Sequence, residues 1–447
     1  MMNEIEIKRA QQIKECRFYT IDDIPLLTRV FEQTYFAEGT EWDYFARSSL
    51  QLPDWFDTKL SPDSQVYAEQ QLRLWRTISG REREYEPETD EKEVSLPDVD
   101  PVRFPGYYRY RGASAVDQAS NHIIATGLIL KHSKLKPGDW ALEYGAGFGQ
   151  IALAFTRLGV NVDTVDISSV FCEYVKANAN FYETNLTPHK GKFGDMPRGP
   201  SHKYDMIYFF EAFHHSLNFH ELIGRLKRAL TPNGKILLCG EPIWRNPTAA
   251  IPYEWGLRLD AETVVVTRSR GWMELGHGAE YLCALFHKHG FKSSYYECPT
   301  TNLGHLYVFE HCAESDPNSK IIDLASYQFP PIEAETWHTI QPNGRWTKEY
   351  SIIPLEQPAE FSDAHIYVCN HLPVEKDLTI AHGGRSSTYN LSPGQSLRIH
   401  IERDIKASKI ALLSSVHSPH ELTNGTSSDK RLLGVFVQKI LFTKEPS

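Results

Sequence analysis

The segment from Trp140 to Ala154, WALEYGAGFGQIALA, combines residue types that could bind a ligand. Gly145, Gly147 and Gly149 alternate with other residues at an expected strand-to-helix junction, where bare backbone can approach a ligand closely. Glu143 stands two positions ahead of them, at the end of the expected strand. A carboxylate there would repel a pyrophosphate and attract an ammonium or sulfonium group. The turn therefore predicts a cationic cofactor that lacks phosphates.

Two further carboxylates follow in order along the chain. Asp166 ends the next expected strand, where it can accept hydrogen bonds from both hydroxyls of a ribose. Asp195, in FGDMP, is expected at the end of the third strand, where it could accept the adenine amino group while the Met196 N–H reaches the ring. A dinucleotide fingerprint has the spacing G-x-G-x-x-G and its acidic residue about 20 residues later. The ordered set predicts S-adenosylmethionine instead.

The segment FFEAFHHS contains the candidate catalytic residues. It follows the fourth expected strand, at the carboxyl edge of the sheet, where ligands of open α/β folds bind. A hydroxyl that accepts a methyl group must lose its proton, and His214 or His215 could take it near neutral pH. Glu211 is the third candidate, although contact with the cofactor is the role we favour for it. Each histidine could instead cap or pack the following helix.

Strand-like and helix-like segments alternate between about residues 117 and 312. DWALEY, NVDTVDI, YDMIYFF and KILLCGE are typical of strands, whereas SSVFCEYVKANANFYE and NFHELIGRLKRAL are typical of helices. This alternation predicts an α/β fold with a Rossmann-like, doubly wound, mostly parallel sheet. KSSYYE and HLYVFE are joined by a short connection, which predicts an antiparallel last strand.

The stretch from about Leu135 to Glu310 resembles class I S-adenosylmethionine-dependent methyltransferases. The resemblance depends on the motifs LEYGAGFGQ, VDIS, GDMP, YDMIYFFEAFHH and LKRALTPNGKILLCGEP. The last motif departs from the usual L-x-P-G-G of that superfamily at Asn233, and asparagine tolerates left-handed backbone. The resemblance implies methyl transfer from S-adenosylmethionine and is nearly silent about the acceptor.

The segments before and after this region have different residue patterns. Helix-like patterns without a chemical motif precede REREYEPETDEKEVSLPDVDP, which is typical of a solvated linker. From about residue 320, short strand-like runs separated by Gly, Pro, Asn and Ser predict an antiparallel β-sandwich. We therefore expect three parts: 1–100, a helical N-terminal region with an acidic linker; 101–315, the methyltransferase domain; and 320–447, the β-sandwich domain.

Two segments are expected to cover the acceptor side. FPGYYRYRG precedes the first helix of the fold, where this superfamily often carries a lid, and an insertion runs from Pro242 to His277. The residues expected to stack on a sugar ring or bind its hydroxyls are Tyr107, Tyr108, Trp244, Trp255, Trp272, Arg258, Asp260 and Glu274. Alternatively, these aromatic residues form a small core beneath a long loop.

The segment GTSSDKRLLGVFVQKILF resembles the closing segment of bacterial surface-polysaccharide biosynthesis proteins. By this analogy we expect O-methylation of a sugar or glycan intermediate. Two alternatives stay open. The acceptor could be a lipid, a quinone or another small metabolite, or the protein could be a catalytically inactive glycan-binding or scaffold protein.

Composition restricts the partners and the compartment. The 447 residues carry a formal net charge of −10, which disfavours nucleic acid as the main partner. The seven cysteines are scattered without a C-x-x-C pair, so neither a disulfide framework nor a metal site is predicted. The N-terminal residues lack the apolar stretch of a signal peptide, and no apolar run approaches the ~20 residues of a membrane span. We expect a cytoplasmic protein and make no prediction of its oligomeric state.

Overall fold

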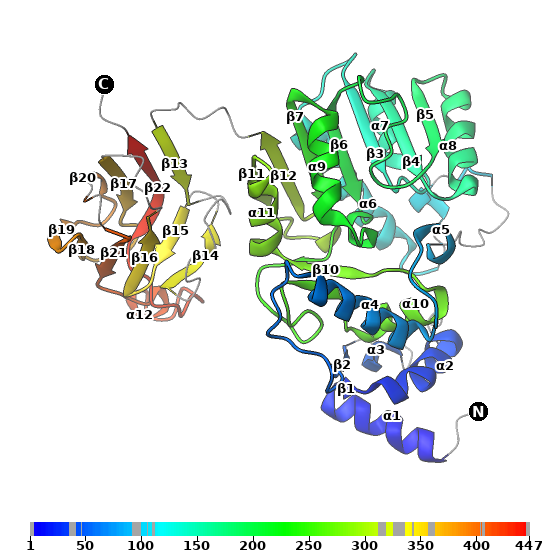
Figure 1. The fold of residues 1–447 in the computed structure, drawn as a ribbon, viewed down its shortest axis with the longest axis horizontal. Coiled ribbons are helices and arrows are strands. Elements are labelled where there is room, and N and C mark those ends of the chain that lie inside the picture. The colour runs from blue at the N-terminus through cyan, green and yellow to red at the C-terminus, as the bar shows by residue number, and fades with distance from the viewer. Residues whose placement is uncertain are drawn as a thin grey trace. The chain divides into compact units, whose positions relative to one another are not determined.

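The structure is a computed structural model that describes most of the chain. The described residues are 4–34, 42–45, 47–91, 100–104, 106–109, 112–311, 319–324, 336–341, 344–355, 363–402, 404 and 407–443. The chain divides into two compact units (Figure 1). The first unit comprises Met1–Leu282 and Tyr296–Val308, and the second comprises Cys283–Tyr295 and Phe309–Ser447. The N-terminal residues therefore belong to the same compact unit as the glycine turn.

A seven-stranded sheet positions the glycine turn. Its strands are β3 (Trp140–Tyr144), β4 (Asn161–Asp166), β5 (Leu186–Lys190), β6 (Tyr204–Phe210), β7 (Leu230–Cys239), β11 (Phe291–Tyr296) and β12 (Leu306–His311). They lie in the order β11-β12-β7-β6-β3-β4-β5, and the four neighbouring pairs from β7 to β5 are all parallel. The order of the chain through the sheet reverses at β3, between β4 and β6. Ligands of open α/β sheets bind outside the strand ends at such a point.

Helices alternate with the strands, and α8 and α9 fall on segments that the sequence predicts to be helical, whereas α10 lies in the insertion, where no helix was predicted. The helices are α6 (Ala115–Ser133), α7 (Gln150–Thr156), α8 (Ser169–Phe181), α9 (Phe219–Ala229), α10 (Ala261–Arg270) and α11 (Ala279–Lys288). Ile129 of α6, Ile151 of α7 and Val175 of α8 share one buried apolar cluster with strand residues such as Val162 and Leu237. Among the described residues, no helix is both long enough and apolar enough to cross a bilayer.

The N-terminal residues form short helices that pack against the insertion. The helices are α1 (Glu4–Cys16), α2 (Ile24–Thr34), α3 (Trp42–Phe45), α4 (Gln65–Ser79) and α5 (Pro87–Asp90), and two short strands, β1 (Phe18–Tyr19) and β2 (Ser49–Leu50), pair in parallel. The Ser64 side chain caps α4, which ends at left-handed Gly80. Trp75 of α4 is fully buried, and its indole N–H donates to the Gly271 carbonyl at 3.0 Å.

The insertion between β7 and α11 has a fold of its own. Strands β8 (Ile243–Trp244), β9 (Trp255–Leu257) and β10 (Leu275–Gly278) form a small sheet in the order β8-β10-β9. Helix α10 begins after Asp260, whose carboxylate accepts the Thr263 N–H at 3.0 Å. Asp260 therefore caps a helix, a structural role that accounts for its position.

From residue 319 onward, the described part of the second unit consists mainly of antiparallel strands. They are β13 (Ser319–Asp323), β14 (Trp337–Gln341), β15 (Gly344–Thr347), β16 (Tyr350–Pro354), β17 (Asp363–Cys369), β18 (Lys376–His382), β19 (Arg385–Leu391), β20 (Ser396–Glu402), β21 (Lys409–Ser414) and β22 (Phe436–Thr443), and the short helix α12 (Pro419–Leu422) lies between β21 and β22 in the chain. One sheet has the order β14-β15-β22-β17-β20 with β13 beside β22, and the other has the order β16-β21-β18-β19. Ile366 and Ile440 of the first sheet share a buried cluster with Leu378 and Leu412 of the second.

Candidate active site

The glycine turn joins β3 to α7 with left-handed backbone at each glycine. The φ angles are +68° at Gly145, +50° at Gly147 and +68° at Gly149. A Cβ at Gly145 would lie 2.6 Å from the Cβ of Ala212, and one at Gly149 would lie 2.7 Å from Val175. A Cβ at Gly147 would meet no atom within 4 Å. Packing within the protein thus excludes side chains at two of these positions, and only Gly147 faces open space.

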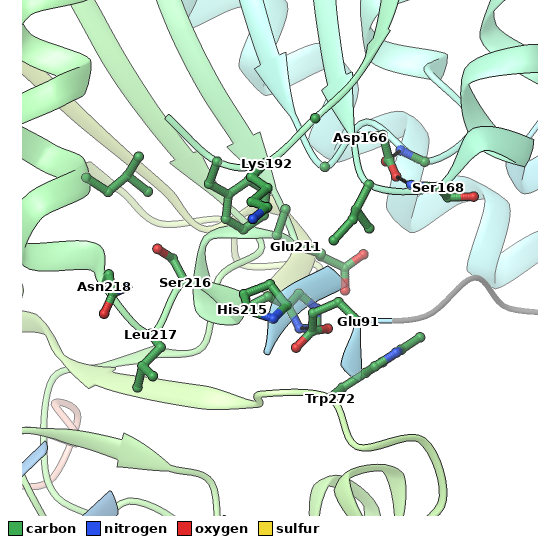
Figure 2. Close-up of a pocket in the computed structure, with 18 of the residues that line it drawn as sticks. Glu91, Asp166, Ser168, Lys192, Glu211, His215, Ser216, Leu217, Asn218 and Trp272 are labelled. Carbon is green, nitrogen blue, oxygen red and sulfur yellow. Dashed lines mark hydrogen bonds and ion pairs between the residues drawn. The ribbon is translucent and has the colours of Figure 1, made fainter. Parts of the chain in front are cut away.

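Asp166 fixes the turn from the neighbouring strand. One carboxylate oxygen accepts the Gly147 N–H at 2.9 Å, and the other accepts the Ser168 N–H at 2.8 Å. Asp166 also lines a cavity of about 520 Å³ that opens beside the glycines (Figure 2). The position predicted for a ribose-binding carboxylate is therefore at a cavity wall and is held by two backbone donors.

Glu143 is buried behind the turn. Its carboxylate accepts the Tyr208 hydroxyl at 2.9 Å, and burial raises the pKa of Glu143 to about 8, against the opposing effect of that hydrogen bond. It lines a second cavity of about 180 Å³, together with Tyr107 and His122. A cation in this cavity would favour the ionised carboxylate.

The two cavities meet at the glycine turn, because Gly145 and Gly147 line both. Asp166 lies on the side of the larger cavity and Glu143 on the side of the smaller one. A carboxylate that accepts hydrogen bonds on one side and a carboxylate that attracts a cation on the other fit a ligand with two hydroxyls at one end and a positive charge at the other, which describes S-adenosylmethionine. The residues present therefore suit the cofactor that the sequence predicts.

Asp195 and Met196 do not line either cavity. The Asp195 carboxylate instead accepts the Lys192 N–H at 2.8 Å, and its carbonyl accepts the Tyr144 hydroxyl at 2.7 Å. These bonds shape the loop after β5, and it is Gly191, Lys192 and Phe193 of this loop that line the larger cavity. The direct adenine contacts expected of Asp195 and Met196 stay a prediction, whereas the hydrogen bonds of Asp195 hold the loop.

Glu211 begins the segment after β6 and faces the larger cavity. Its backbone is left-handed, with φ +50°, which is unusual for a residue with a side chain and is often found at functional sites. Burial, and then the nearby carboxylate of Glu241, raise the pKa of Glu211 to about 7. The Glu211 side chain lines the larger cavity and is 42 % exposed. A carboxyl group with this pKa is suited to general base catalysis near neutral pH.

His214 is a buried structural residue rather than a cavity residue. Its Nδ1 lies 2.8 Å from a carboxylate oxygen of Glu241, which also accepts the backbone N–H groups of Ala212, Phe213 and His214. Burial lowers the pKa of His214 well below its ordinary value. Glu241 therefore organises the 3-10 turn Phe213–His215, and His214 does not line the larger cavity.

His215, in contrast, lines the larger cavity. Its Nδ1 lies 3.3 Å from a carboxylate oxygen of Glu91, and its ring meets Trp272 edge to face at 5.7 Å. Burial lowers the pKa of His215, but the carboxylates of Glu91, Glu274 and Glu241 more than offset this and raise it to about 9. At neutral pH the ring is therefore an imidazolium, which donates protons in hydrogen bonds and does not accept one. This differs from the role of proton acceptor that we expected for it.

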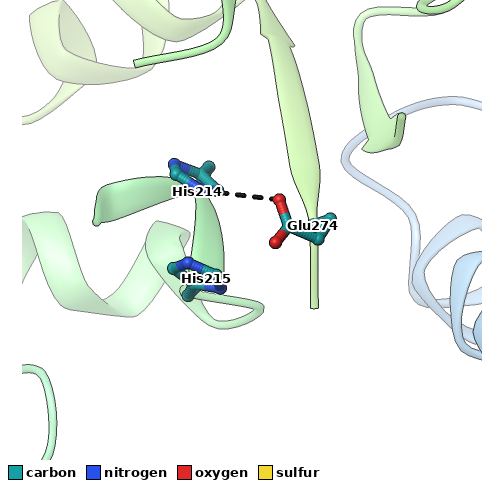
Figure 3. A group of neighbouring side chains, drawn as sticks. All are labelled: His214, His215 and Glu274. Atoms are coloured by element: carbon teal, nitrogen blue, oxygen red, sulfur yellow. Dashed lines mark ion pairs between the residues drawn. The ribbon is translucent and has the colours of Figure 1, made fainter. Parts of the chain in front are cut away.

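His214, His215 and Glu274 lie close enough to bind a divalent cation together, since one ligand atom from each falls within 4.8 Å of the others (Figure 3). Each already has a partner in the protein: Glu241 for His214, Glu91 for His215, and the Arg258 guanidinium for Glu274. Because Arg258 supplies the positive charge beside Glu274, an ion-pair network accounts for the arrangement. The expectation of no metal site stays a prediction.

Several residues expected to bind the acceptor lie in the protein interior. Trp255 is buried against Phe219, with its indole N–H donating to the Pro62 carbonyl at 2.9 Å. Arg258 and Glu274 are paired with each other and do not line the larger cavity. Trp255 thus belongs to the small core that was the alternative interpretation for the aromatic residues, and acceptor contacts of Arg258 and Glu274 stay a prediction.

The other expected acceptor residues have mixed positions. Trp244 lies in β8 against Gly276, where a Cβ would approach its indole to 2.7 Å. Tyr107 lines the smaller cavity, and Tyr108 is 54 % exposed. Trp272 does line the larger cavity, as we expected.

Some cavity residues carry no signal in the sequence. Tyr85, Pro87 and Glu91 line the larger cavity from the segment that we interpreted as a solvated linker. The carboxylates and proline of that segment do suggest solvent, and only its position in the fold shows that it covers a site. Lys192 and Phe193 directly precede the motif GDMP in the sequence. That position next to a motif expected at the cofactor is the signal that could have found them.

Comparison with known proteins identifies the domain. Residues 142–238 match a family described as "Methyltransferase domain". The chain contains a methyltransferase domain. The protein is an S-adenosylmethionine-dependent methyltransferase, and S-adenosylmethionine is its cofactor. The matched residues include Glu143, the glycine turn, Asp166 and Glu211.

Solved structures resemble the chain at low identity. The YcgJ protein of Bacillus subtilis is 21 % identical, with 39 % of this chain and 71 % of that chain covered and a TM-score of 0.34. The 1,6-didemethyltoxoflavin-N1-methyltransferase of Burkholderia thailandensis, crystallised with S-adenosylhomocysteine, is 16 % identical, with 49 % and 94 % covered and a TM-score of 0.34. Similarity at this level does not indicate which acceptor the methyltransferase uses. No curated protein matches the chain.

Proposed function

We propose that this methyltransferase O-methylates a sugar or glycan intermediate. The observation that supports this is the wall of the larger cavity beyond the glycine turn, where Trp272 lies among Glu211, His215, Ser216 and Asn218. A sugar ring offers an apolar face to an aromatic ring and hydroxyls to polar side chains. A lipid or quinone acceptor would favour an apolar wall instead. The resemblance of the C-terminal segment to surface-polysaccharide proteins supports the same substrate class by analogy.

The cofactor contacts are part of this proposal. Asp166 would accept the ribose hydroxyls, Glu143 would face the positive charge of the amino acid end, and the glycine turn would approach the ligand through Gly147. Asp195 would accept the adenine amino group and the Met196 N–H would reach the ring, while Asp195 also holds its loop through Lys192 and Tyr144. We also propose a cytoplasmic location and a sandwich arrangement for the second unit, both from sequence composition and pattern.

Glu211 is the residue we propose as proton acceptor. When bound, S-adenosylmethionine supplies an electrophilic methyl group on a sulfonium. Glu211 would accept the proton that the acceptor hydroxyl loses on methylation, because its pKa of about 7 leaves a large ionised fraction at neutral pH. His215 carries its proton under the same conditions and is less suited to this task.

The test is an acceptor search with the full-length protein. The protein is incubated with S-adenosylmethionine labelled in the methyl group and with separate fractions of nucleotide-sugars, lipid-linked glycans, quinones and small metabolites. We expect label in a sugar-containing fraction, and loss of that label in the Glu211→Gln variant. Label confined to quinones or lipids without sugar would overturn the proposed acceptor class and leave the methyltransferase assignment intact.

A further inference from the structure

The segment after α4 contributes an unexpected wall to the larger cavity. Tyr85, Pro87 and Glu91 all line it, although they lie far from the glycine turn in the sequence. Figure 2 shows Glu91 beside His215 on the side of the cavity where Trp272 also lies. An acidic segment outside the methyltransferase motifs is thus in contact with the acceptor side of the site.

Glu91 is held in place from two directions. The carboxylate oxygen that does not face His215 accepts the Tyr85 hydroxyl and the Met273 N–H, each at 2.7 Å. The preceding residue, Asp90, is fully buried and is paired with Arg83 at 2.7 Å. A carboxylate with two donors on one oxygen has little freedom to rotate. Its second oxygen therefore remains directed at His215.

His215 is correspondingly constrained. Nδ1 faces Glu91 at 3.3 Å, and the ring is flanked by Trp272 at 5.7 Å and by the His214 ring at 4.3 Å. Among the described residues, neither ring nitrogen of His215 makes a hydrogen bond, and Nδ1 is buried, with Glu91 as its ion-pair partner. Because His215 lines the cavity, Nε2 is the ring atom available to a ligand there.

The charges around His215 agree with this geometry. Three carboxylates face His215: Glu91 from the N-terminal segment, Glu274 from just before β10, and Glu241 from just after β7. The Arg258 guanidinium neutralises the charge of Glu274, and the His214 ring stays uncharged. The carboxylates raise the pKa of His215 to about 9 in spite of burial. Both ring nitrogens therefore carry hydrogen at neutral pH.

We propose that Glu91 is a positioning residue for methyl transfer, which fixes the His215 ring so that its Nε2–H points into the cavity as a hydrogen-bond donor to the acceptor. The inference rests on the proposed function and adds a requirement on the substrate. The acceptor presents an oxygen to His215 while the hydroxyl that is methylated gives its proton to Glu211. Two oxygens within reach of one site are a property of sugars and of other polyols.

The first test measures the His215 ring directly and needs no acceptor. Histidine side chains are labelled with ¹³C and ¹⁵N in the full-length protein, the His215 signal is assigned by its loss in His215→Asn, and its titration is followed by NMR. We expect a pKa near 9 in the unaltered protein and a fall of at least about one unit in Glu91→Gln. Glutamine keeps an oxygen for Tyr85 and Met273, so the local fold is preserved.

Two variants complete the test. Glu84→Gln changes a 77 % exposed carboxylate of the same segment, paired with Arg76, and should leave the titration of His215 unchanged. Glu91→Asp keeps the negative charge but moves it farther from His215, so the His215 pKa should lie between those of the unaltered protein and Glu91→Gln. This variant also provides the test if Glu91→Gln does not fold. An unchanged His215 titration in both Glu91 variants would overturn the inference.

The second readout separates this inference from the proposed function. With the fraction that accepts label, Glu91→Gln should lower kcat/KM about tenfold and move the alkaline decline of its pH profile to lower pH, while Glu84→Gln does neither. If methyl transfer to a sugar is found and the alkaline decline does not move, the role of Glu91 is wrong. If His215 titrates as expected and no polyol accepts label, the proposed acceptor is wrong while the ring geometry stands.

Discussion

At the scale of single residues, two carboxylates border the glycine turn from neighbouring parallel strands, Glu143 from β3 and Asp166 from β4. In the insertion, Trp255 and Glu274 are buried and Arg258 pairs with Glu274, so their expected contacts with an acceptor stay a prediction. A sequence does not show whether an aromatic or charged residue of an insertion faces a ligand or the interior. Glu91 could not be found at all.

Asp166 should be required for cofactor binding. In Asp166→Ala the hydroxyl acceptors are lost and the Gly147 N–H loses its partner, so we expect the affinity for S-adenosylmethionine to fall about 100-fold or more. Calorimetric titration measures this. Asp163→Asn is no suitable control, because Asp163 is buried and paired with Arg198, whereas the exposed Glu173 of α8 can be changed to Gln without effect. Unaltered affinity in Asp166→Ala would contradict the assignment.

Glu143 should make the free protein less stable as pH rises. Burial raises its pKa to about 8 from the 4.5 of an unperturbed glutamate, so the folded protein binds this proton more tightly than the unfolded chain does. The free energy of unfolding therefore falls as pH increases from about 4.5 to about 8, by at most about 1.4 kcal/mol per unit from this group.

Replacing Glu143 with Gln removes this dependence. The variant should equal the unaltered protein near about pH 5 and be the more stable of the two near about pH 8, in urea unfolding without cofactor. Asp195→Asn provides a comparison at a carboxylate outside both cavities. Parallel stability curves for Glu143→Gln and the unaltered protein would show that the group is ionised throughout this range.

Glu211 should control the acidic side of the pH–rate profile. Since the carboxylate must be ionised to accept a proton, kcat/KM should rise with pH through about 7. Glu211→Gln should lower kcat about 100-fold or more and remove that rise. The measurement is label transfer to the identified acceptor across the pH range, with the exposed Glu173→Gln as the reference variant. A rise that persists in Glu211→Gln belongs to another group.

At the scale of elements, the parallel strands and their order follow from pattern, whereas the details of the turn depend on packing. The alternation of strands and helices gave β3 to β7 with parallel pairing, because buried parallel strands and amphipathic crossover helices have distinct periodicities. The sequence did not show that Gly145 and Gly149 avoid clashes with Ala212 and Val175. Those contacts join segments distant in the chain.

Substitutions at two of these glycines should accordingly have different effects, one on the stability of the protein and the other on cofactor binding. Gly145→Ala would place its Cβ 2.6 Å from that of Ala212 at a φ of +68°, so we expect a loss of about 2–4 kcal/mol in stability. Gly147→Ala meets no protein atom and should lose less, yet its methyl group would enter the cavity and weaken cofactor binding. Ala212→Gly should restore part of the stability of Gly145→Ala. Absence of rescue would locate the strain elsewhere.

At the scale of the molecule, the first unit joins three regions that the sequence presented as separate. The N-terminal helices pack on the insertion, and the segment between them and the sheet lines the cavity. Hydrophobic patterning identifies each helix, but it does not indicate which element the helix packs against, because one apolar face can pack against many other apolar faces. The boundary expected near residue 100 therefore divides what is one compact unit in the structure.

This joining predicts that a change in α4 affects the active site. Trp75→Ala removes a fully buried indole that packs against Tyr85 and donates to the Gly271 carbonyl, and should cost about 3–5 kcal/mol of stability. Because Tyr85 orients Glu91, kcat/KM should also fall at temperatures where the variant is still folded.

Leu412→Ala, in the buried cluster of the second unit, is the matched core truncation. It should destabilise that unit without changing the affinity for S-adenosylmethionine, whose proposed contacts all belong to the first unit. Normal turnover by folded Trp75→Ala would show that the N-terminal helices support the unit without setting the geometry of its site.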